Sequence, residues 1–487
     1  YLSGRYQAYE QGNGLLNIPD AWLLLSAGKM PTVNIESSVP VNTVLSAFLA
    51  TPGYGVGIND REGVEAGDNY TRTYTFKRTT GPASANNYNV TWVDNDGTFS
   101  SPASVVLPKN TAVSFVVNVN PTTSGVHSAI LNLDNPGTPG IDYQTMNVVV
   151  AADQFTVGNS YTVAKSGNLG PGQYKTYFFN VPAGTPALKV DMTGGGAAAG
   201  AGAIRFLRWH PYGVGIDSNG VSNCYNGAAG GCTTGSATSR TVTNPFPGVW
   251  EVTVDARRNS DAVSAPFTLT VSILGATVAP NPATVPTATI GVPVNVPVTV
   301  TNIYGPFSGR AVGSTLGSAN IATPTIAHGA SQVYNLTVTP GSTSLRATIG
   351  STSDPAADLD LFLYNCTTGP CVLAGQSADG DSEESVTVAN PAAGAWQVQV
   401  DGYSVPAGTT TYKYIDVFVN PGFGTVAVTD ADALRASGAS WNPPVAVTAL
   451  AAPAAGRVLF GTIDIRTAAP ANLLVGQGQV IVQNVTP

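Results

Sequence analysis

The stretch N-P-F-P-G-V-W-E-V-T-V-D at residues 244–255 returns as N-P-A-A-G-A-W-Q-V-Q-V-D at residues 390–401. Proline and glycine favour a turn at the start of both copies. After the turn, the tryptophan and the two valines alternate with other residues, so they share one face of an extended strand. The repeat therefore predicts a turn that leads into a strand buried on one side. Its structural positions are Trp250, Asp255, Trp396 and Asp401.

The repeat extends upstream of this stretch. The segment Q-Y-K-T-Y-F-F-N-V at 173–181 matches S-Q-V-Y-N-L-T-V at 331–338. Each copy therefore has an opening strand and a tryptophan strand. We assign the first repeat module to residues 153–275 and the second repeat module to residues 325–420.

Each repeat module also contains two nearby cysteines, Cys224 with Cys232 and Cys366 with Cys371. The surrounding loops are rich in Gly, Asn and Thr and offer no histidine for a zinc site. We therefore expect two small local disulfides, with pairs of reduced thiols as the alternative. Disulfides indicate an oxidising, extracellular location.

The composition predicts an all-β protein with several domains. The 487 residues exceed one hydrophobic core, 43% of them are hydrophobic, and 54 Gly and 35 Pro suit short strands joined by tight turns. The net charge is −8, and no cluster of Lys and Arg can neutralise a run of phosphates, so we expect no nucleic-acid partner. No apolar run approaches the roughly 20 residues of a membrane span.

A second, weaker repeat lies outside the two modules. P-A-S-V at 102–105 precedes alternating apolar residues at 113–119, and P-A-T-V at 282–285 precedes alternating valines at 292–300. Both patterns are typical of an immunoglobulin-like sandwich. Proline cannot donate to a strand ladder, so Pro293 and Pro297 predict that 292–300 is one edge strand.

These repeats divide the chain into a terminal segment and several sandwiches. We expect a first immunoglobulin-like sandwich at 29–152, with alternating strands at 71–76, 88–92, 113–119 and 129–133. A second sandwich begins at 276–324 but is too short there to close. Residues 421–487 are rich in predicted strands and can complete it. The second repeat module is then inserted into this sandwich, and the alternative is two independent small units.

Residues 1–28 differ from the rest of the chain. They predict a Gly-rich turn and a short helix, with Pro19 in the first turn and Asp20 where the helix dipole favours a negative charge. The segment resembles the last helix of the subtilisin-like peptidase domain, whose motif G-x-G-x-x-N-x-x-x-A matches Gly12, Gly14, Asn17 and Ala21.

The resemblance continues along the chain. Residues 55–63 and 124–127 are similar to the sandwich that follows the catalytic domain in large subtilases, and the repeat modules resemble bacterial pre-peptidase C-terminal (PPC) domains. The resemblance implies the C-terminal, post-catalytic region of a large secreted subtilisin-like serine peptidase. The expected fold is a tandem array of immunoglobulin or fibronectin III-like and jelly-roll or PPC-like β-sandwiches with a short N-terminal helix.

The chain departs from the family at the catalytic residues. A subtilisin-type enzyme needs Asp, His and a Ser with an oxyanion donor, and the serine motif G-T-S-M-A does not occur. The chain has three histidines, of which we interpret His127 and His328 as surface or filler residues and His210 as a local contact. We therefore expect that this chain is not itself an enzyme and that the catalytic domain lies upstream.

Acidic residues gather in the second repeat module. Alternation puts Asp358 and Asp360 on one strand face, and further carboxylates follow at Asp354, Asp379, Asp381, Glu383 and Glu384. Convergent carboxylates suit calcium, so Asp358, Asp360, Asp379 and Asp381 form a candidate calcium site, with solvated acidic loops as the alternative. Aligning 206–207 with 362–363 puts Gly202 and Ile204 at the two strand Asp positions, so we expect calcium in the second module alone.

The leading functional hypothesis is a non-catalytic accessory region that stabilises a secreted protease, binds substrates or a surface, or mediates assembly. Its partners would be the upstream catalytic domain of the same precursor, a second copy, or an extracellular protein or cell-surface polymer. The alternative is a structural subunit of an extracellular filament or surface layer, which the low charge and modular sandwiches also suit.

Overall fold

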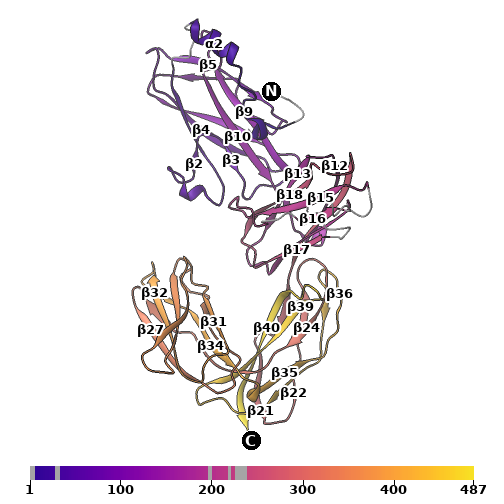
Figure 1. Cartoon of the computed structure of the whole chain (residues 1–487). Coiled ribbons are helices and arrows are strands. Elements are labelled where there is room, and N and C mark those ends of the chain that lie inside the picture. The colour runs from indigo at the N-terminus through magenta and orange to yellow at the C-terminus, as the bar shows by residue number, and fades with distance from the viewer. Residues whose placement is uncertain (1–5, 28–32, 196–199, 218–220, 225–237) are drawn as a thin grey trace. The chain divides into compact units, whose positions relative to one another are not determined.

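The computed structural model describes residues 6–27, 33–195, 200–217, 221–224 and 238–487. The chain divides into two compact units, Tyr1–Ile273 and Leu274–Pro487. Strands dominate both units (Figure 1), and the α-helices of the described residues are α1 (Ala8–Gln11) and α2 (Ile18–Ser26). The all-β prediction is confirmed.

The first unit begins with an immunoglobulin-like sandwich of two five-stranded sheets. One sheet has the order β2 (Tyr54–Gly55), β1 (Ile35–Pro40), β4 (Tyr70–Arg78), β8 (Ala112–Val119), β6 (Phe99–Ser100). The other has the order β3 (Asn59–Asp60), β10 (Tyr143–Ala151), β9 (Gly125–Asp134), β5 (Asn86–Val93), β7 (Ser104–Leu107). Alternate residues of the central strands point into one core, which includes Tyr74, Phe76, Phe115 and Leu131. The strands predicted at 71–76, 88–92, 113–119 and 129–133 lie within β4, β5, β8 and β9.

The second half of this unit is another pair of sheets. One has the order β11 (Asp153–Gln154), β13 (Tyr174–Val181), β18 (Gly248–Ala256), β15 (Ala203–Trp209), β16 (Val221–Cys224). The other has the order β12 (Thr162–Leu169), β19 (Ala265–Leu274), β14 (Ala187–Thr193), β17 (Thr238–Thr243). The repeat stretch 244–255 supplies β18, the middle strand of the first sheet.

The two halves of the first unit meet in a small apolar cluster flanked by charges. Val150 and Ala152 at the end of the first sandwich contact Phe178 and Val249 of the repeat module. Beside this cluster, Glu62 Oε2 accepts a hydrogen bond from the Val249 amide (2.9 Å). Burial raises the pKa of Glu62, although that hydrogen bond and the nearby Arg61 lower it. The contact between the two sandwiches therefore combines apolar packing with the half-buried carboxylate of Glu62.

The second unit contains five sheets. The largest has nine strands and follows the path β21 (Ala283–Thr289), β40 (Leu474–Thr486), β39 (Val458–Thr467), β25 (Gly317–Ala322), β34 (Lys413–Val419), β28 (Ser344–Gly350), β31 (Ser385–Ala389), with β24 (Phe307–Gly313) and β36 (Ala433–Arg435) off this path. A four-stranded sheet has the order β27 (Ser331–Val338), β32 (Gly394–Ser404), β29 (Asp358–Asn365), β30 (Val372–Ser377). One three-stranded sheet has the order β20 (Ala276–Ala279), β23 (Thr299–Asn302), β37 (Ser440–Trp441), and another has the order β22 (Val294–Asn295), β38 (Val445–Ala449), β35 (Gly424–Val428). The last sheet pairs β26 (Thr325–Ala327) with β33 (Thr409–Thr411).

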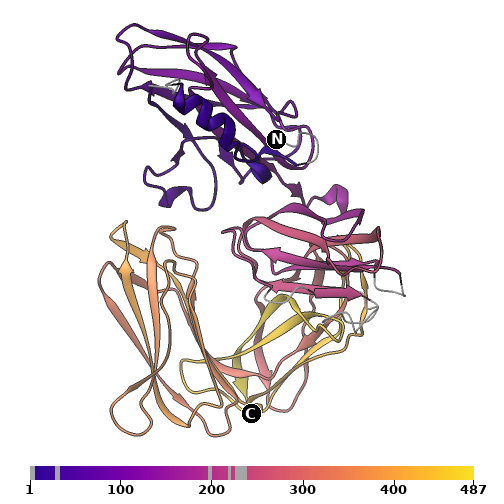
Figure 2. The ribbon, with the colours of Figure 1, turned by 45° about the horizontal axis from the view of Figure 1, so that its top comes forward.

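Strands from residues 276–324 pair with strands from residues 421–487. β21 pairs with β40, β22 with β38, β23 with β37, and β24 with both β36 and β39. In Figures 1 and 2 the strands of 325–420 form one lobe of this unit and the two flanking segments form the other. These pairings are those that an inserted second repeat module requires, and we retain that domain division as a proposal.

The prediction of one edge strand over 292–300 is wrong. The segment forms two short strands in different sheets, β22 before Pro297 and β23 after it. β22 lies at an edge, but β23 lies between β20 and β37. Prolines at 293 and 297 remove two backbone donors, so one ladder cannot continue along the segment, and the chain crosses from one sheet to the next.

The repeat stretch has the same local structure in both modules. Asn244 and Asn390 have positive φ angles of 45° and 47°, and the glycine four residues later has a φ angle of 122° or 128°. Trp250 and Trp396 are buried, and each indole Nε1 donates to a carbonyl of its own turn, Phe246 O or Ala392 O, at 2.8 Å. In each module the tryptophan side chain therefore both closes the turn before its strand and fills part of the hydrophobic core.

Candidate functional site

The acidic residues of the second repeat module gather at one end of its four-stranded sheet. Asp358 and Asp360 share one face of β29, while Leu359 and Leu361 on the opposite face are fully buried. Carboxylate oxygens of Asp379, Asp381 and Glu384, between β30 and β31, lie within 4.8 Å of one another. The structure thus brings Asp379 and Asp381 together with Glu384, which the candidate set of four residues had not included.

Asp358 and Asp360 face this group of carboxylates. Burial raises the pKa of Asp358, and the charges of Asp379 and Asp381 raise it further. The pKa of Asp360 is raised in the same way, by burial first and then by charges that include Asp358 and Asp401. Mutual repulsion of this kind favours either protonation or a bound cation.

Two carboxylates of the cluster, Glu384 and Asp358, differ in their hydrogen-bond partners. Glu384 is buried and accepts hydrogen bonds from the Ser377 hydroxyl and the Asp379 amide, which are neutral donors. Asp358 Oδ1 is buried and has no hydrogen-bond partner among the described residues. An orphaned carboxylate oxygen among hard oxygen ligands fits a cation such as calcium.

Two of the acidic residues noted in the sequence have other partners. Asp354 accepts hydrogen bonds from the amides of Ala356 (3.1 Å) and Ala407 (2.9 Å). Glu383 accepts a hydrogen bond from the Ser351 amide (2.6 Å). Both carboxylates therefore hold loops in place.

Strand register corrects the comparison between the two modules. In the first module Phe206 pairs with Val254, and in the second Leu361 pairs with Val400, the equivalent valine of the repeat. The sequence alignment of 206–207 with 362–363 was therefore wrong by one residue, because it matched identical letters rather than the buried positions. Arg205, and not Ile204, occupies the position of Asp360.

This substitution reverses the charge beside the repeat aspartate. In the first module the guanidinium of Arg205 binds Asp255 through two hydrogen bonds of 2.7 and 2.9 Å. In the second module Asp360 lies opposite Asp401, the equivalent aspartate. The first module therefore has the positive side chain of Arg205 beside its repeat aspartate, whereas the second module has the negative side chain of Asp360 at the same position.

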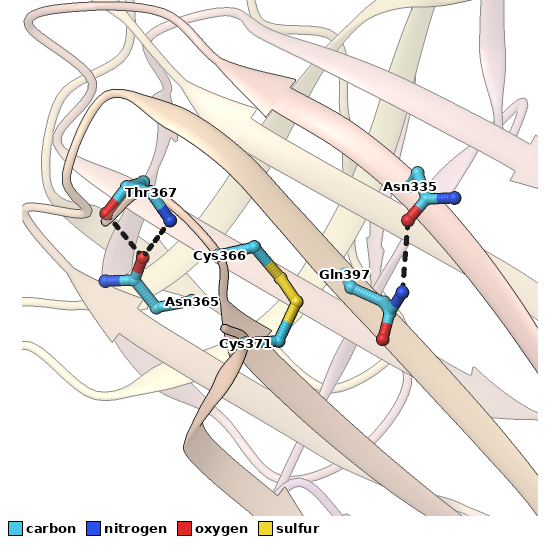
Figure 3. The surroundings of a disulfide bond; sticks show 6 residues. All are labelled: Asn335, Asn365, Cys366, Thr367, Cys371 and Gln397. Atoms are coloured by element: carbon cyan, nitrogen blue, oxygen red, sulfur yellow. Dashed lines mark hydrogen bonds between the residues drawn. A yellow bond between two sulfur atoms is a disulfide. The ribbon is translucent and has the colours of Figure 1, made fainter. Parts of the chain in front are cut away.

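The disulfide Cys366–Cys371 joins the end of β29 to the start of β30 (Figure 3). Asn365, the last residue of β29, precedes the turn between the two cysteines, and its Oδ1 accepts hydrogen bonds from the Thr367 amide and hydroxyl. The other expected disulfide, Cys224 with Cys232, lies outside the described residues, since Cys232 and the side chain of Cys224 are not described.

Each of the three histidines has a structural environment. His127 is buried, so of the two expected roles, surface or filler, it has the second. Its ring nitrogens lie 2.6 Å from Asp96 Oδ2 and 2.8 Å from the Thr123 carbonyl oxygen. His328 Nδ1 accepts a hydrogen bond from the Val405 amide (3.1 Å). His210 lies against three aromatic rings, Tyr212, Phe246 and Trp250, and partial burial lowers its pKa.

The N-terminal helix α2 exposes its apolar side chains. Asn17 caps its first turn by accepting a hydrogen bond from the Asp20 amide (3.3 Å). No residue of α2 is buried, and the exposed apolar side chains in and before it are Leu15, Leu16, Ile18, Trp22, Leu23, Leu24 and Leu25. The preceding helix α1 is anchored, since Ala8 is buried and the Tyr9 amide donates to Ser128 Oγ (3.1 Å). Sequence reasoning predicted the helix but did not identify its uncovered face.

Two segments of the chain match known families. Residues 36–151 match the Ig-like domain in actinomycete serine proteases, and residues 330–402 match the bacterial pre-peptidase C-terminal domain. Pyrolysin from Pyrococcus furiosus is 26% identical over 425 residues, which cover 83% of this chain and 27% of pyrolysin. The chain thus spans about a quarter of the length of this relative.

The chain also has likenesses among solved structures. Tripeptidyl peptidase 2 aligns with all of this chain and 43% of its own, at 11% identity and a TM-score of 0.49. The secreted serine protease VesC from Vibrio cholerae aligns with 43% of this chain and 48% of its own, at 13% identity and a TM-score of 0.26.

The family matches point to an extracellular location. Within the described residues, no helix has both the length and the hydropathy that crossing a membrane requires. The chain thus contains an Ig-like domain of actinomycete serine proteases and a PPC domain, and its similarity to the subtilisin-like pyrolysin over most of its length agrees with the C-terminal region of a subtilase.

Proposed function

We propose that this chain is the non-catalytic accessory region of a secreted subtilisin-like serine peptidase, and that it stabilises the peptidase domain by packing against it. The observation that carries the proposal is the match of residues 36–151 to a domain found in serine proteases. The environments of the three histidines support it: in the part of the chain that the structure describes, their hydrogen bonds go to Asp96, to the backbone of Thr123, Tyr212 and Val405, and not to a serine hydroxyl.

The exposed face of α2 supports a contact with a preceding domain. A monomeric protein rarely leaves a run of leucines and a tryptophan in water. On this proposal the apolar side chains of α2 are covered by the peptidase domain, and Ala8 of α1 ties the contact to β9 and β10 of the first sandwich.

The acidic cluster has a stabilising role in this proposal. A calcium ion bound by Asp358, Asp360, Asp379, Asp381 and Glu384 would offset their repulsion and join β29 to the loop before β31. The ion would supply charge neutralisation and crosslinking, and no bond-breaking chemistry is assigned to it.

The test begins with the native secreted protein, labelled with a fluorophosphonate probe that reacts with activated serines. We expect the label on a peptidase domain that is covalently joined or tightly bound to residues 1–487, and none on residues 1–487. A label within residues 1–487, or a native sample without a labelled domain, contradicts the proposal. Ordered polymers in negative-stain images of the unlabelled sample favour the filament or surface-layer alternative.

A further inference from the structure

A second uncovered apolar surface lies in the first immunoglobulin-like sandwich. Residues 37–59 contain no Asp, Glu, Lys, Arg or His, although Glu36 and Asp60 flank them. Within this segment the side chains of an apolar loop, which we define as residues 43–56, are exposed: Leu45 44%, Phe48 82%, Leu49 41%, Tyr54 48% and Val56 68%. An uncharged loop with these side chains in water is typical of a protein contact surface.

The apolar loop has a defined backbone. Its centre is the short 3₁₀ helix Ser46–Phe48, which the Gly53 amide closes by donating to the Ser46 carbonyl (2.8 Å). Its end, β2, pairs with β1 in the sheet. The following Gly57 lies so close to β10 that an added Cβ would be 1.9 Å from the Met146 carbonyl oxygen. The loop is therefore held in place before any partner binds, which lowers the entropy cost of binding.

The chemistry of the loop selects its partner. Without a cation it cannot hold a phosphate or an anionic surface, and the exposed Leu, Phe and Val side chains favour an apolar protein surface. The loop belongs to the domain whose family occurs in serine proteases, and α2 at the N-terminal side of the same domain is uncovered as well. A peptidase domain joined to this chain would reach both surfaces at high effective concentration, so modest apolar contacts suffice.

We infer that the apolar loop is a docking surface for the peptidase domain of the same protein, with Phe48 as its central contact. This inference rests on the proposed function and extends it, because it assigns the contact to residues 43–56 of the sandwich in addition to α2. It predicts an interface without ion pairs at the loop, and therefore one that high salt does not weaken.

Hydroxyl-radical footprinting by mass spectrometry tests the inference directly. The native secreted protein and the isolated chain 1–487 are oxidised in parallel. Because interface cores exclude water, Phe48 and Tyr54 should react about tenfold more slowly in the native protein than in the isolated chain. Tyr403, which is 69% exposed in the second unit, is the control and should react equally in both.

A variant pair separates docking from folding. Phe48→Ser should leave the thermal midpoint of the isolated chain unchanged, because Phe48 is exposed there. It should shorten the inactivation half-life of the native protease by about tenfold or more, the factor expected for one lost buried Phe. Val116→Ser, which removes an exposed side chain of β8, should change neither. Equal oxidation of Phe48 in both samples, or an unchanged half-life of the Phe48→Ser protease, overturns the inference.

Two further outcomes have distinct meanings. Protection of Phe48 in the isolated chain that increases with protein concentration would show a second copy as the occupant and would overturn the inference. A native sample without a fluorophosphonate-labelled domain contradicts the proposed function itself, whereas a labelled domain with an unprotected loop contradicts the docking surface alone.

Discussion

At position 360 the second repeat module has an aspartate where the first module has Arg205. The arginine pairs with Asp255, while Asp360 faces Asp401 and the other acidic residues of the cluster. The charges of Arg205 and Asp255 therefore cancel in the first module, whereas Asp360 and Asp401 add two negative charges to the acidic cluster of the second module. This single exchange is the best physical argument for a cation in the second module alone.

Calcium is expected to stabilise the second repeat module. Saturating calcium should raise the thermal midpoint of the second unit, Leu274–Pro487, by roughly 5–10 °C over chelator, as expected for a ligand present about 100-fold above its Kd. Asp360→Asn should abolish this response and should be no less stable than wild type in chelator, because it removes repulsion. Asp432→Asn, which alters a half-exposed pair with Arg310, is the matched control and should respond to calcium like wild type. If the wild type had the same thermal midpoint in calcium and in chelator, the prediction of a calcium site would be wrong.

The raised pKa of Asp358 and Asp360 gives a pH dependence with a definite sign. The native state binds their protons more tightly than the unfolded chain, so stability falls as the pH rises from about 4, the usual pKa of Asp, through the raised values. We expect this loss in chelator, and we expect calcium to suppress it. Denaturant melts from acidic to neutral pH measure it, and a rise in the stability of the module over this range in chelator would contradict the assignment.

A buried ion pair joins β34 to the segment before β39. Arg457 contacts Asp416 Oδ1 at 2.5 Å, and Asp416 is buried and also accepts a hydrogen bond from Tyr414. Arg457→Met should lower the free energy of unfolding of the second unit by about 3–5 kcal/mol, because it leaves a buried carboxylate uncompensated. Arg310→Met breaks a half-exposed pair and should cost at most about 1 kcal/mol. If Arg457→Met and Arg310→Met lowered the free energy of unfolding by similar amounts, burial of the Arg457–Asp416 pair would not be what makes it important.

At the scale of the element, β32 depends on the tryptophan of the repeat. Trp396→Phe removes the hydrogen bond to the Ala392 carbonyl and part of the core volume, so it should lower the free energy of unfolding by about 1–3 kcal/mol. Tyr403→Phe, in the same strand but exposed, should stay within about 0.5 kcal/mol of wild type. Equal effects in chemical denaturation would show that the turn does not need the indole.

The strands also show the limits of reading a pattern. Alternation predicted strands within β4, β5, β8 and β9. In β4, β5 and β8 buried positions alternate with more exposed ones, whereas residues 127–133 of β9 are all buried. The same alternation misled at 292–300, where the valines were read as one strand. Val296, Val298 and Val300 are indeed buried, but Val300 alone of the three lies in a strand, β23, while Val296 and Val298 lie in the connection between β22 and β23.

At the scale of the whole molecule, the domain division can be tested by limited proteolysis. If the second repeat module is inserted, a fragment of 276–324 should stay bound to 421–487 after cleavage, because β21 pairs with β40 and β22 with β38. Gel filtration followed by mass spectrometry detects the pair. Release of the 276–324 fragment as a free peptide would favour two independent units.

The all-β class, the twofold repeat and the absence of the G-T-S-M-A motif could all be read from the amino-acid sequence. These are local properties, since alternation, turn residues and cysteine spacing are visible within short windows. The resemblance to subtilases was visible for the same reason, because motif residues lie close together in the chain.

Tertiary structure alone decided which residues lie opposite one another. Strand register placed Arg205 at the position of Asp360. The fold of the loop between β30 and β31 brought Glu384 to Asp379 and Asp381, and the packing of β9 buried His127 beside Asp96. The structure also showed that the described residues leave the apolar side chains of α2 and of the apolar loop exposed. Burial and pairing between distant segments depend on which sheet edge each strand joins, and a local pattern carries no information about that choice.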